Sequence, residues 1–351
     1  MPPAPGELTS IEICAGAGGQ ALGLERAGFR HVALVENDPA CCETLRSVRR
    51  WRSAVLPISV KHFYAAEFAG EVDLFAGGVP CPPFSRAGLR LGADDGRDLF
   101  PTAIRLIKEC QPRAVMLENV RGLMSSSFDD YRREVIVRPL REAGYVPLGW
   151  RLLEAKDFGV PQLRPRAIFV ALRADAAPFF RWPDERDHVP APTVGQALRK
   201  EMGRGGWEGA AEWAAKADDI APTLVGGSKK HGGPDLGPTQ ARKQWERLHV
   251  NGKLVAVDPP PRGWDGDRPI LTVRMAAILQ GFPRDWPFWG SKTAAYRQVG
   301  NAFPPPVAEA VGRRIAAALR AADGGDQAPA ELADLGSRDL AGEPELSLLP
   351  A

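Results

Sequence analysis

The chain has no run of apolar residues long enough to cross a bilayer, and its opening MPPAPGELTS lacks the basic and apolar segments of a secretory signal. Cysteine is scarce: the five thiols form an odd set, and no two of them have the CxxC spacing of a zinc site. An odd, unpaired set also argues against a disulfide framework. We therefore expect a cytoplasmic protein without a metal site or a membrane segment.

A large excess of charge of one sign is also missing, because 45 Lys and Arg residues face 43 Asp and Glu residues. The acids gather near the end of the chain, where residues 325–351 hold six of them and one arginine. That segment has no aromatic residue and is rich in Ala, Gly and Pro, so we expect it to be disordered. The remainder of the chain is correspondingly more basic, which favours a polyanionic partner.

Apolar runs of strand length alternate with helical patterns through the first half of the chain. The expected strands cover 10–14, 32–35, 72–76, 114–117 and 167–172, and the expected helices cover 20–27, a segment from about 39, and 99–110. This βαβα order predicts an α/β fold with a mostly parallel, doubly wound, Rossmann-like sheet that is covered by helices on both faces.

The pattern changes after about residue 180, where tryptophans, prolines and a glycine-rich run replace the regular periodicity. An irregular insertion of this length is unusual unless it forms a binding surface, so we predict a smaller, loop-rich domain at 186–268. Helical patterns resume at 273–279 and 307–321. The predicted organisation is a large domain at 1–185, the smaller domain, a segment at 269–324 that returns to the large domain, and the tail at 325–351.

A glycine-rich turn, Gly16-Ala17-Gly18-Gly19, follows the first expected strand and opens the first expected helix. Its backbone can approach a ligand closely and offer N–H groups at a helix N-terminus, which suits a nucleotide-like cofactor. Glu36 ends the second strand, where a carboxylate can accept both hydroxyls of a ribose. The turn alone does not separate NAD from S-adenosylmethionine, and a plain strand-to-helix turn remains the alternative.

The stretch GGVPCPPFSRAG places Cys81 between Pro80 and the pair Pro82-Pro83, directly after an expected strand. Prolines fix φ on both sides of the thiol and remove backbone donors, so the loop is stiff. Open α/β sheets carry their chemistry at strand ends of this kind. Cys81 is therefore either a positioned nucleophile or a small buried residue of a structural turn.

Seven segments taken together resemble the DNA (cytosine-5)-methyltransferases of bacterial or phage type. They appear in the family's order, from Ile13 to Val307, as ICAGAGG, VENDP, DLFAGGVPCPPFS, ENVRGL, QLRPR, TVRMAAILQGFP and QVGNAFPPPVA. The resemblance covers nearly the whole chain, and seven blocks in sequence are highly specific. It implies that 1–185 is a catalytic domain and that 186–268 recognises the target.

The resemblance also implies the roles of four catalytic residues. Cys81 matches the thiolate that adds to C6 of cytosine, and Glu118 matches the carboxyl group that delivers a proton to N3. Arg166 matches the arginine that binds the base oxygen and orients the carboxylate. Arg164 matches the arginine that supports the site and the DNA backbone. Asn119 is expected to shape the turn beside Glu118.

S-adenosylmethionine is the cofactor that the resemblance implies. The matching positions are Cys14, Ala15, Gly16, Gly18, Gly19, Glu36, Asn37, Ser59, Asp73, Pro80, Asn301 and Ala302. The chain departs from the family pattern at three places: Cys14 stands where phenylalanine is usual, Pro82 where glutamine is common, and Ser59 where an acid usually lies near the adenine amine. The departures at these positions bear on cofactor affinity, and none changes Cys81, Glu118 or Arg166.

Double-stranded DNA is the implied substrate, and its target base must leave the stack to reach a thiol. The implied DNA contacts are Ser85, Gln162, Thr223, Leu224, Lys229 and Lys230, the last two in a basic, glycine-rich segment at 227–253. We expect a monomer, with a restriction endonuclease of the same site as a possible companion. Three alternatives stay open: an RNA cytosine methyltransferase, a catalytically silent DNA-binding homologue, and a NAD oxidoreductase.

Overall fold

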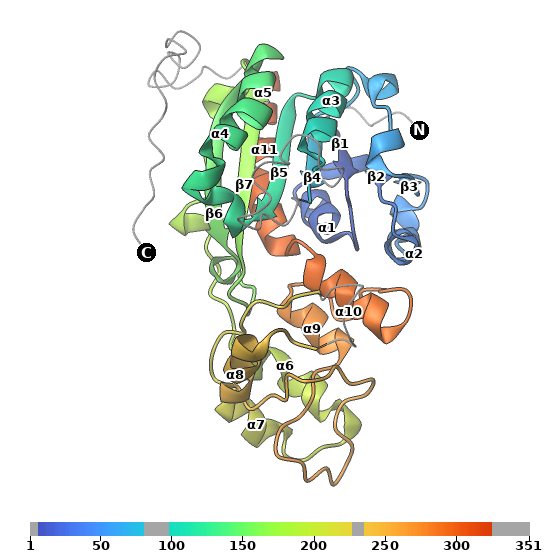
Figure 1. The fold of residues 1–351 in the computed structure, drawn as a ribbon, viewed down its shortest axis with the longest axis vertical. Coiled ribbons are helices and arrows are strands. Elements are labelled where there is room, and N and C mark those ends of the chain that lie inside the picture. The colour runs from blue at the N-terminus through green and yellow to red at the C-terminus, as the bar shows by residue number, and fades with distance from the viewer. Residues whose placement is uncertain (1–5, 81–97, 227–234, 325–351) are drawn as a thin grey trace.

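The structure is a computed structural model that describes residues 6–80, 98–226 and 235–324 of the chain (Figure 1). Several predictions fall outside these ranges. They concern Cys81, Pro82, Ser85, Lys229, Lys230 and the tail at 325–351. Among the described residues, no helix is both long enough and apolar enough to span a bilayer.

A single sheet of seven strands forms the upper part of the molecule in Figure 1, in the order β3-β2-β1-β4-β5-β7-β6. Strands β1 to β5 are parallel, and β7 is antiparallel to both β5 and β6. The strands are β1 (Leu8–Ile13), β2 (Phe29–Val35), β3 (Val55–Leu56), β4 (Leu74–Gly78), β5 (Ala114–Val120), β6 (Tyr145–Glu154) and β7 (Pro165–Arg173). The predicted mostly parallel α/β sheet is confirmed.

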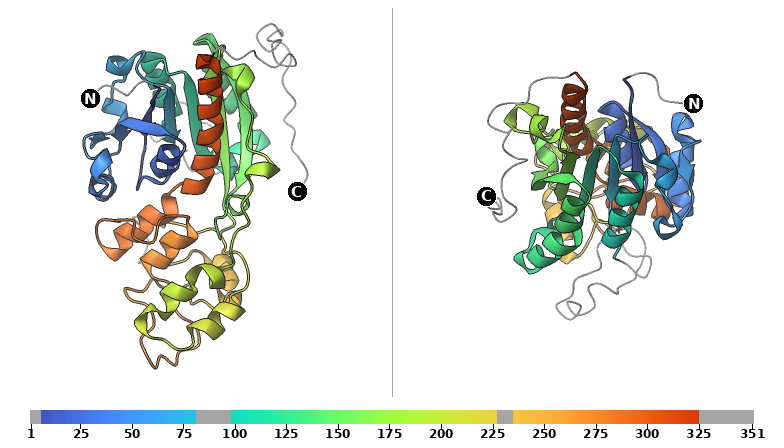
Figure 2. Two further views of the ribbon diagram at one scale, coloured as in Figure 1. Left: turned by 180° about the vertical axis from the view of Figure 1, so that it is seen from behind. Right: turned by 90° about the horizontal axis from the view of Figure 1, so that it is seen from above.

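Helices cover both faces of the sheet, as the continuous apolar strands require. Alternate residues of β4 point to opposite faces: Phe75 packs in the cluster that contains α3, while Leu74 and Ala76 pack in the cluster that contains α1 and α11. Figure 2 shows α11 lying along the back of the sheet. The covering helices are α1 (Gly19–Arg26), α2 (Pro39–Ser47), α3 (Phe100–Cys110), α4 (Asp129–Tyr131), a π-helical segment (Arg132–Val137), α5 (Arg138–Glu142) and α11 (Pro305–Asp323).

Gly23 permits the close packing of α1 against α11. A Cβ atom at this position would lie 2.4 Å from the carbonyl oxygen of Pro305 and 2.5 Å from Cβ of Ala308. The first contact is with backbone, which cannot move aside as a flexible side chain could. The C-terminal helix is therefore fixed against the helix that follows the glycine turn.

A second group of helices forms the lower part of the molecule in Figure 1. It comprises α6 (Val194–Met202), α7 (Ala210–Lys216), α8 (Thr239–Arg247), α9 (Val273–Leu279) and α10 (Lys292–Asn301). The segment 186–268 is thus more helical than we predicted, because α6 to α8 lie within it. Thr193 closes a capping box with Gln196 at the start of α6, a local signal that the sequence does contain.

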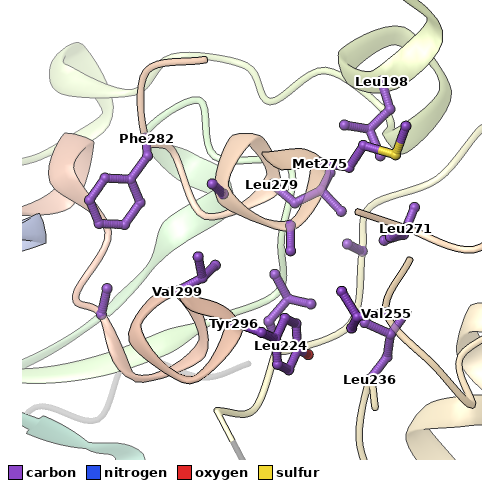
Figure 3. Close-up of a cluster of buried hydrophobic side chains, with 14 of the residues drawn as sticks. Leu198, Leu224, Leu236, Val255, Leu271, Met275, Leu279, Phe282, Tyr296 and Val299 are labelled. Carbon is purple, nitrogen blue, oxygen red and sulfur yellow. The ribbon is translucent and has the colours of Figure 1, made fainter. Parts of the chain in front are cut away.

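These helices share an apolar core in which α9 and α10 are central (Figure 3). Met275 and Leu279 of α9 lie opposite Tyr296 and Val299 of α10. Leu224, from the chain between α7 and α8, packs beside them. The same cluster continues into α1 and α2 of the sheet domain. The domain boundaries at 185 and 268 stay a prediction.

Candidate active site and cofactor pocket

A cavity of about 900 Å³ opens at the carboxyl ends of β1, β2, β4 and β5. The chain leaves β1 toward β2 on one side, while β4 pairs with β1 on the other side, so the connections diverge at this point. Ligands of open α/β sheets bind at such a switch point. The cavity is lined by the glycine turn, the ends of these strands and one side of α10.

Most of the predicted cofactor residues line this one cavity. They are Cys14, Ala15, Gly16, Gly19, Glu36, Asn37, Ser59, Pro80, Asn301 and Ala302. Gly18 lies within the same turn and is the N-cap of α1, with a φ of 81°. The structure therefore brings together segments that are almost 290 residues apart in the chain.

Asp73 is the exception, and its assignment to the cofactor site is corrected. It immediately precedes β4, at the amino end of the strand, whereas the cavity lies beyond the carboxyl end. Its carboxylate accepts from the backbone N–H of Thr9 at 2.7 Å and pairs with Arg113 at 3.1 Å. Arg113 in turn pairs with Asp323, so Asp73 helps fasten α11 to the far end of the sheet.

Glu36 fixes the shape of the glycine turn. One carboxylate oxygen accepts from the backbone N–H of Gly16 at 2.8 Å, and the other accepts from the N–H groups of Asn37 and Asp38, also at 2.8 Å. Gly19 leaves no room for a side chain, since a Cβ atom there would lie 2.2 Å from the carbonyl oxygen of Phe303. The turn is thus held between β2 and the end of α10.

The far wall of the cavity is α10, which is fixed to α2. Gln298 accepts a hydrogen bond from the hydroxyl of Thr44 at 2.6 Å, and Arg297 approaches Asp38 at 3.6 Å. Asp38 also caps the N-terminus of α2 through the N–H groups of Ala40 and Cys41. These contacts hold Asn301, at the end of α10, across the cavity from the glycine turn.

Glu12 is a pocket residue that we did not predict. Its side chain lies on β1 beneath the turn and is 1 % exposed, and its Oε2 has no hydrogen-bond partner among the described residues. Burial, together with the nearby charge of Glu36, holds the pKa of Glu12 well above its usual range. The sequence does contain a signal for this pocket residue, namely a carboxyl group within the otherwise apolar strand SIEIC. A buried, unpartnered acceptor facing a cavity suits a cationic or N–H donor group of a ligand.

Cys14 adopts a φ of 53° and also lines the cavity. Burial, with smaller contributions from Glu36 and Glu12, raises the pKa of its thiol to about 12. The thiol therefore stays neutral at physiological pH and presents a small apolar surface.

Glu118 and Arg166 form an ion pair at another wall of the same cavity. Nε of Arg166 lies 2.8 Å from Oε1 of Glu118, and the two side chains are only 10 % and 12 % exposed. The antiparallel pairing of β5 with β7 places Ile168 opposite Glu118 and Arg166 two residues further along, on the same face. Burial raises the pKa of Glu118, while the charges of Arg166 and Arg164 oppose this rise.

The backbone before Cys81 is fixed next to this ion pair. Gly78 is the direct neighbour of Glu118 across the sheet, and a Cβ atom there would come within 3.2 Å of the Glu118 carboxylate. Asn119 donates a hydrogen bond of 2.7 Å from Nδ2 to the carbonyl oxygen of Val79, and it accepts one from the N–H of Val120. Asn119 therefore shapes the site as we expected, and Pro80, the residue before Cys81, lines the cavity.

Arg164, Gln162 and Leu224 are all buried, which corrects their predicted contacts with DNA. The guanidinium of Arg164 donates to main-chain carbonyl oxygens, and the side chain of Gln162 bonds to Leu279 and Gln280. No side chain of the three is available to a phosphate or a base in this structure. Thr223 is partly exposed, and its hydroxyl donates to the carbonyl oxygen of Leu163, so its DNA contact stays a prediction.

Comparisons with known proteins agree with this geometry. The family model of C-5 cytosine-specific DNA methylases matches residues 8–317. The chain belongs to this family. It is 55 % identical over 318 residues to the Type II methyltransferase M.NaeI of Lentzea aerocolonigenes, covering 89 % of this chain and 75 % of that protein. It is 51 % identical over 322 residues to M.NgoMIV of Neisseria gonorrhoeae, covering 90 % and 99 %.

A solved structure of the family has the same fold. The crystal structure of a prophage-encoded E. coli protein described as a DNA modification methyltransferase superposes with a TM-score of 0.61 at 25 % identity, covering 89 % of this chain and 99 % of that chain. The chain is thus a DNA (cytosine-5)-methyltransferase. Within 6–80, 98–226 and 235–324, no cluster of His, Cys, Asp and Glu could hold a metal ion.

The ion pair predicts a distinct pH dependence for the variant Arg166→Met. Without the arginine, the pKa of the buried Glu118 rises further, so the folded state keeps a proton that the unfolded chain releases above about pH 4.3. The stability of the variant relative to wild type should therefore fall as the pH rises from 5 to 8. We expect a loss of about 3–5 kcal/mol at pH 8, measured by urea unfolding.

The double variant Glu118→Gln/Arg166→Met is the matched control, because it lacks the carboxyl group at position 118 whose titration is being tested. Its stability relative to wild type should change much less with pH than that of Arg166→Met. Equal pH profiles for the single and double variants would contradict the assigned ion pair.

Proposed function

We propose that this enzyme transfers a methyl group from S-adenosylmethionine to C5 of a cytosine that has left the DNA stack, through a transient bond between Cys81 and C6 of the base. One observation carries the proposal. A single cavity is lined both by the glycine turn with Glu36 and by the Glu118–Arg166 pair, and Pro80 reaches its edge directly before Cys81.

The lining of the cavity fits S-adenosylmethionine, which supplies a methyl group on a sulfonium centre. In this proposal Glu36 accepts from the ribose hydroxyls at the end of β2, and the turn at Gly16 lets the backbone approach the ligand. The unpartnered Oε2 of Glu12 offers a buried acceptor for the ammonium group. The neutral thiol of Cys14 and the hydroxyl of Ser59 stand where the family usually has a phenylalanine and an acid.

The residues at the other wall fit the activation of cytosine, because C5 of the neutral base is a poor nucleophile. Addition of the Cys81 thiolate to C6 makes C5 electron-rich, and the addition is easier when N3 gains a proton as it proceeds. Glu118 is suited to give this proton, because burial raises its pKa and so favours the protonated form. Arg166 holds the carboxyl group and can donate to the base oxygen. After the methyl group has passed to C5, loss of the C5 proton, expulsion of the Cys81 thiolate and return of the N3 proton to Glu118 restore the ring and the free enzyme.

A cytosine inside a duplex does not expose C6 to a thiol, so the base has to rotate out at an expense of a few kcal/mol. The partners we propose are duplex DNA, read by the segment 227–253 with Thr223 on the backbone, and a restriction endonuclease of the same site. We propose that the enzyme acts as a monomer. The relatives M.NaeI and M.NgoMIV are both named Type II methyltransferases, which favours DNA over RNA as the acceptor.

The variant Cys81→Ser tests the proposed nucleophile. A serine hydroxyl is ionised far less readily than a thiol, so transfer of tritium from methyl-labelled S-adenosylmethionine to plasmid DNA should fall to background. Binding to the same DNA in a filter assay should persist. The variant Cys110→Ala, which removes a thiol from the end of α3 outside the cavity, should keep its activity. Full transfer by Cys81→Ser would refute the mechanism.

The variant Glu36→Gln tests the cofactor site. Loss of a charged acceptor removes about 1.5–3 kcal/mol, so S-adenosylhomocysteine should bind roughly 10- to 150-fold more weakly in calorimetry. Glu43→Gln on α2 makes the same change of charge at an exposed position that pairs with Arg46, and its affinity should equal that of wild type. An unchanged affinity of Glu36→Gln would remove Glu36 from the site.

A further inference from the structure

Arg164 makes an unusual set of contacts for an arginine next to an active site. It is 1 % exposed, and its three acceptors at 3.0 Å or less are main-chain carbonyl oxygens rather than carboxylates. One belongs to Leu224, at 2.7 Å, and the others belong to Gly300 and Ala302, at 2.6 and 3.0 Å. Burial and the charge of Arg166 hold the pKa of the guanidinium well below its usual range. One buried side chain thus joins two segments that are otherwise distant in sequence.

Two glutamines complete this connection. The amide oxygen of Gln162 accepts from the N–H of Leu224 at 2.8 Å, and its nitrogen donates to Oε1 of Gln280 at 2.7 Å. Gln280 then donates to the carbonyl oxygen of Ala302, which Arg164 also contacts. Both glutamines are fully buried, so these hydrogen bonds are shielded from water. We call Arg164, Gln162 and Gln280 the junction.

The two joined segments also touch each other directly. A Cβ atom at Gly300 would lie 2.4 Å from the backbone nitrogen of Gly226, and one at Gly226 would lie 2.2 Å from Oδ1 of Asn301. The backbones can cross this closely only because both positions are glycine. The side chain of Leu224 is fully buried in the cluster that contains Tyr296 and Val299 of α10, which strengthens the same contact (Figure 3).

The joined segments serve different parts of the proposed site. Asn301, Ala302 and Phe303 line the cavity that we assign to the cofactor. Thr223 to Gly226 lead directly into the basic segment 227–253 that we assign to DNA recognition. The junction therefore lies between these two segments. A ligand that orders residues 301–303 also favours order in residues 223–226, and the reverse holds as well.

We propose that Arg164, with Gln162 and Gln280, is a positioning junction that couples cofactor binding to DNA binding. The inference rests on the proposed function and adds a coupling between its two binding events. Binding of the cofactor against residues 301–303 fixes the carbonyl groups of Gly300 and Ala302, and Arg164 transmits this order to Leu224. By linkage, DNA must raise cofactor affinity by the same factor as the cofactor raises DNA affinity.

The test measures the coupling factor by calorimetry. The probe is S-adenosylhomocysteine, which has no methyl group to transfer, titrated with and without a duplex that carries the site wild type methylates, mapped by bisulfite sequencing. We expect wild type to bind it between about 5-fold and 150-fold more tightly in the presence of the duplex. In Arg164→Met we expect this ratio to fall below about 3-fold, because methionine cannot join the two segments.

The control variant is Arg113→Met. Arg113 likewise joins separate segments, but it does so through two acidic side chains and a main-chain carbonyl at the opposite end of the sheet. It should lose stability while keeping the coupling ratio of wild type, so a merely structural role of Arg164 is distinguished from coupling. If Arg164→Met does not fold, Gly226→Ala decides, since the added methyl group separates the same segments without removing a buried charge.

The outcomes separate this inference from the proposed function. If wild type binds neither S-adenosylhomocysteine nor the duplex, the proposed function itself fails. If wild type binds both with a ratio near 1, or if the folded junction variant keeps the wild-type ratio, the coupling is refuted and the proposed function stands. A collapsed ratio in Arg164→Met or Gly226→Ala, with Arg113→Met unchanged, supports the junction.

Discussion

The buried ion pair between Glu118 and Arg166 is the constraint around which the site is organised. A lone carboxylate at this depth would be costly, and so would a lone guanidinium, so the pairing of β5 with β7 has to deliver both to one place. Gly78 lets the carboxylate lie close to β4, because a Cβ atom there would come within 3.2 Å of it. The strand that leads to Cys81 is thereby built against the acid that the proposed chemistry needs.

The rest of the cavity follows from close backbone approaches. The glycine turn is held by Glu36 on one side and by the chain after α10 on the other, where Gly19 meets Phe303. The C-terminal segment therefore completes a pocket that the N-terminal half begins. The apolar core around α9 and α10 extends into α1 and α2, so the lower helices and the sheet domain share packing as well as the pocket.

Local patterns predicted the parallel strands, the glycine turn and Glu36, because periodicity and turn chemistry are written in neighbouring residues. They did not predict β6, since Pro147 and Gly149 interrupt it and its register shifts there. The burial of Gln162 depends on partners 62 and 118 residues away, which no local pattern encodes. Asp73 was misassigned from its motif alone, although the direction of β4 puts it at the end away from the cavity. Glu12 was overlooked although a carboxyl group in an apolar strand was visible.

Covalent trapping tests the central claim most directly, namely that sulfur at position 81 attacks the base. A duplex with 5-fluorocytosine at the methylated position cannot lose a proton from C5, so the adduct cannot resolve once methyl transfer has occurred. With S-adenosylmethionine present, the account predicts a denaturant-resistant complex on a gel, with the nucleotide attached to the peptide that contains Cys81 in mass spectrometry. The absence of an adduct, or attachment to any other residue, would contradict it.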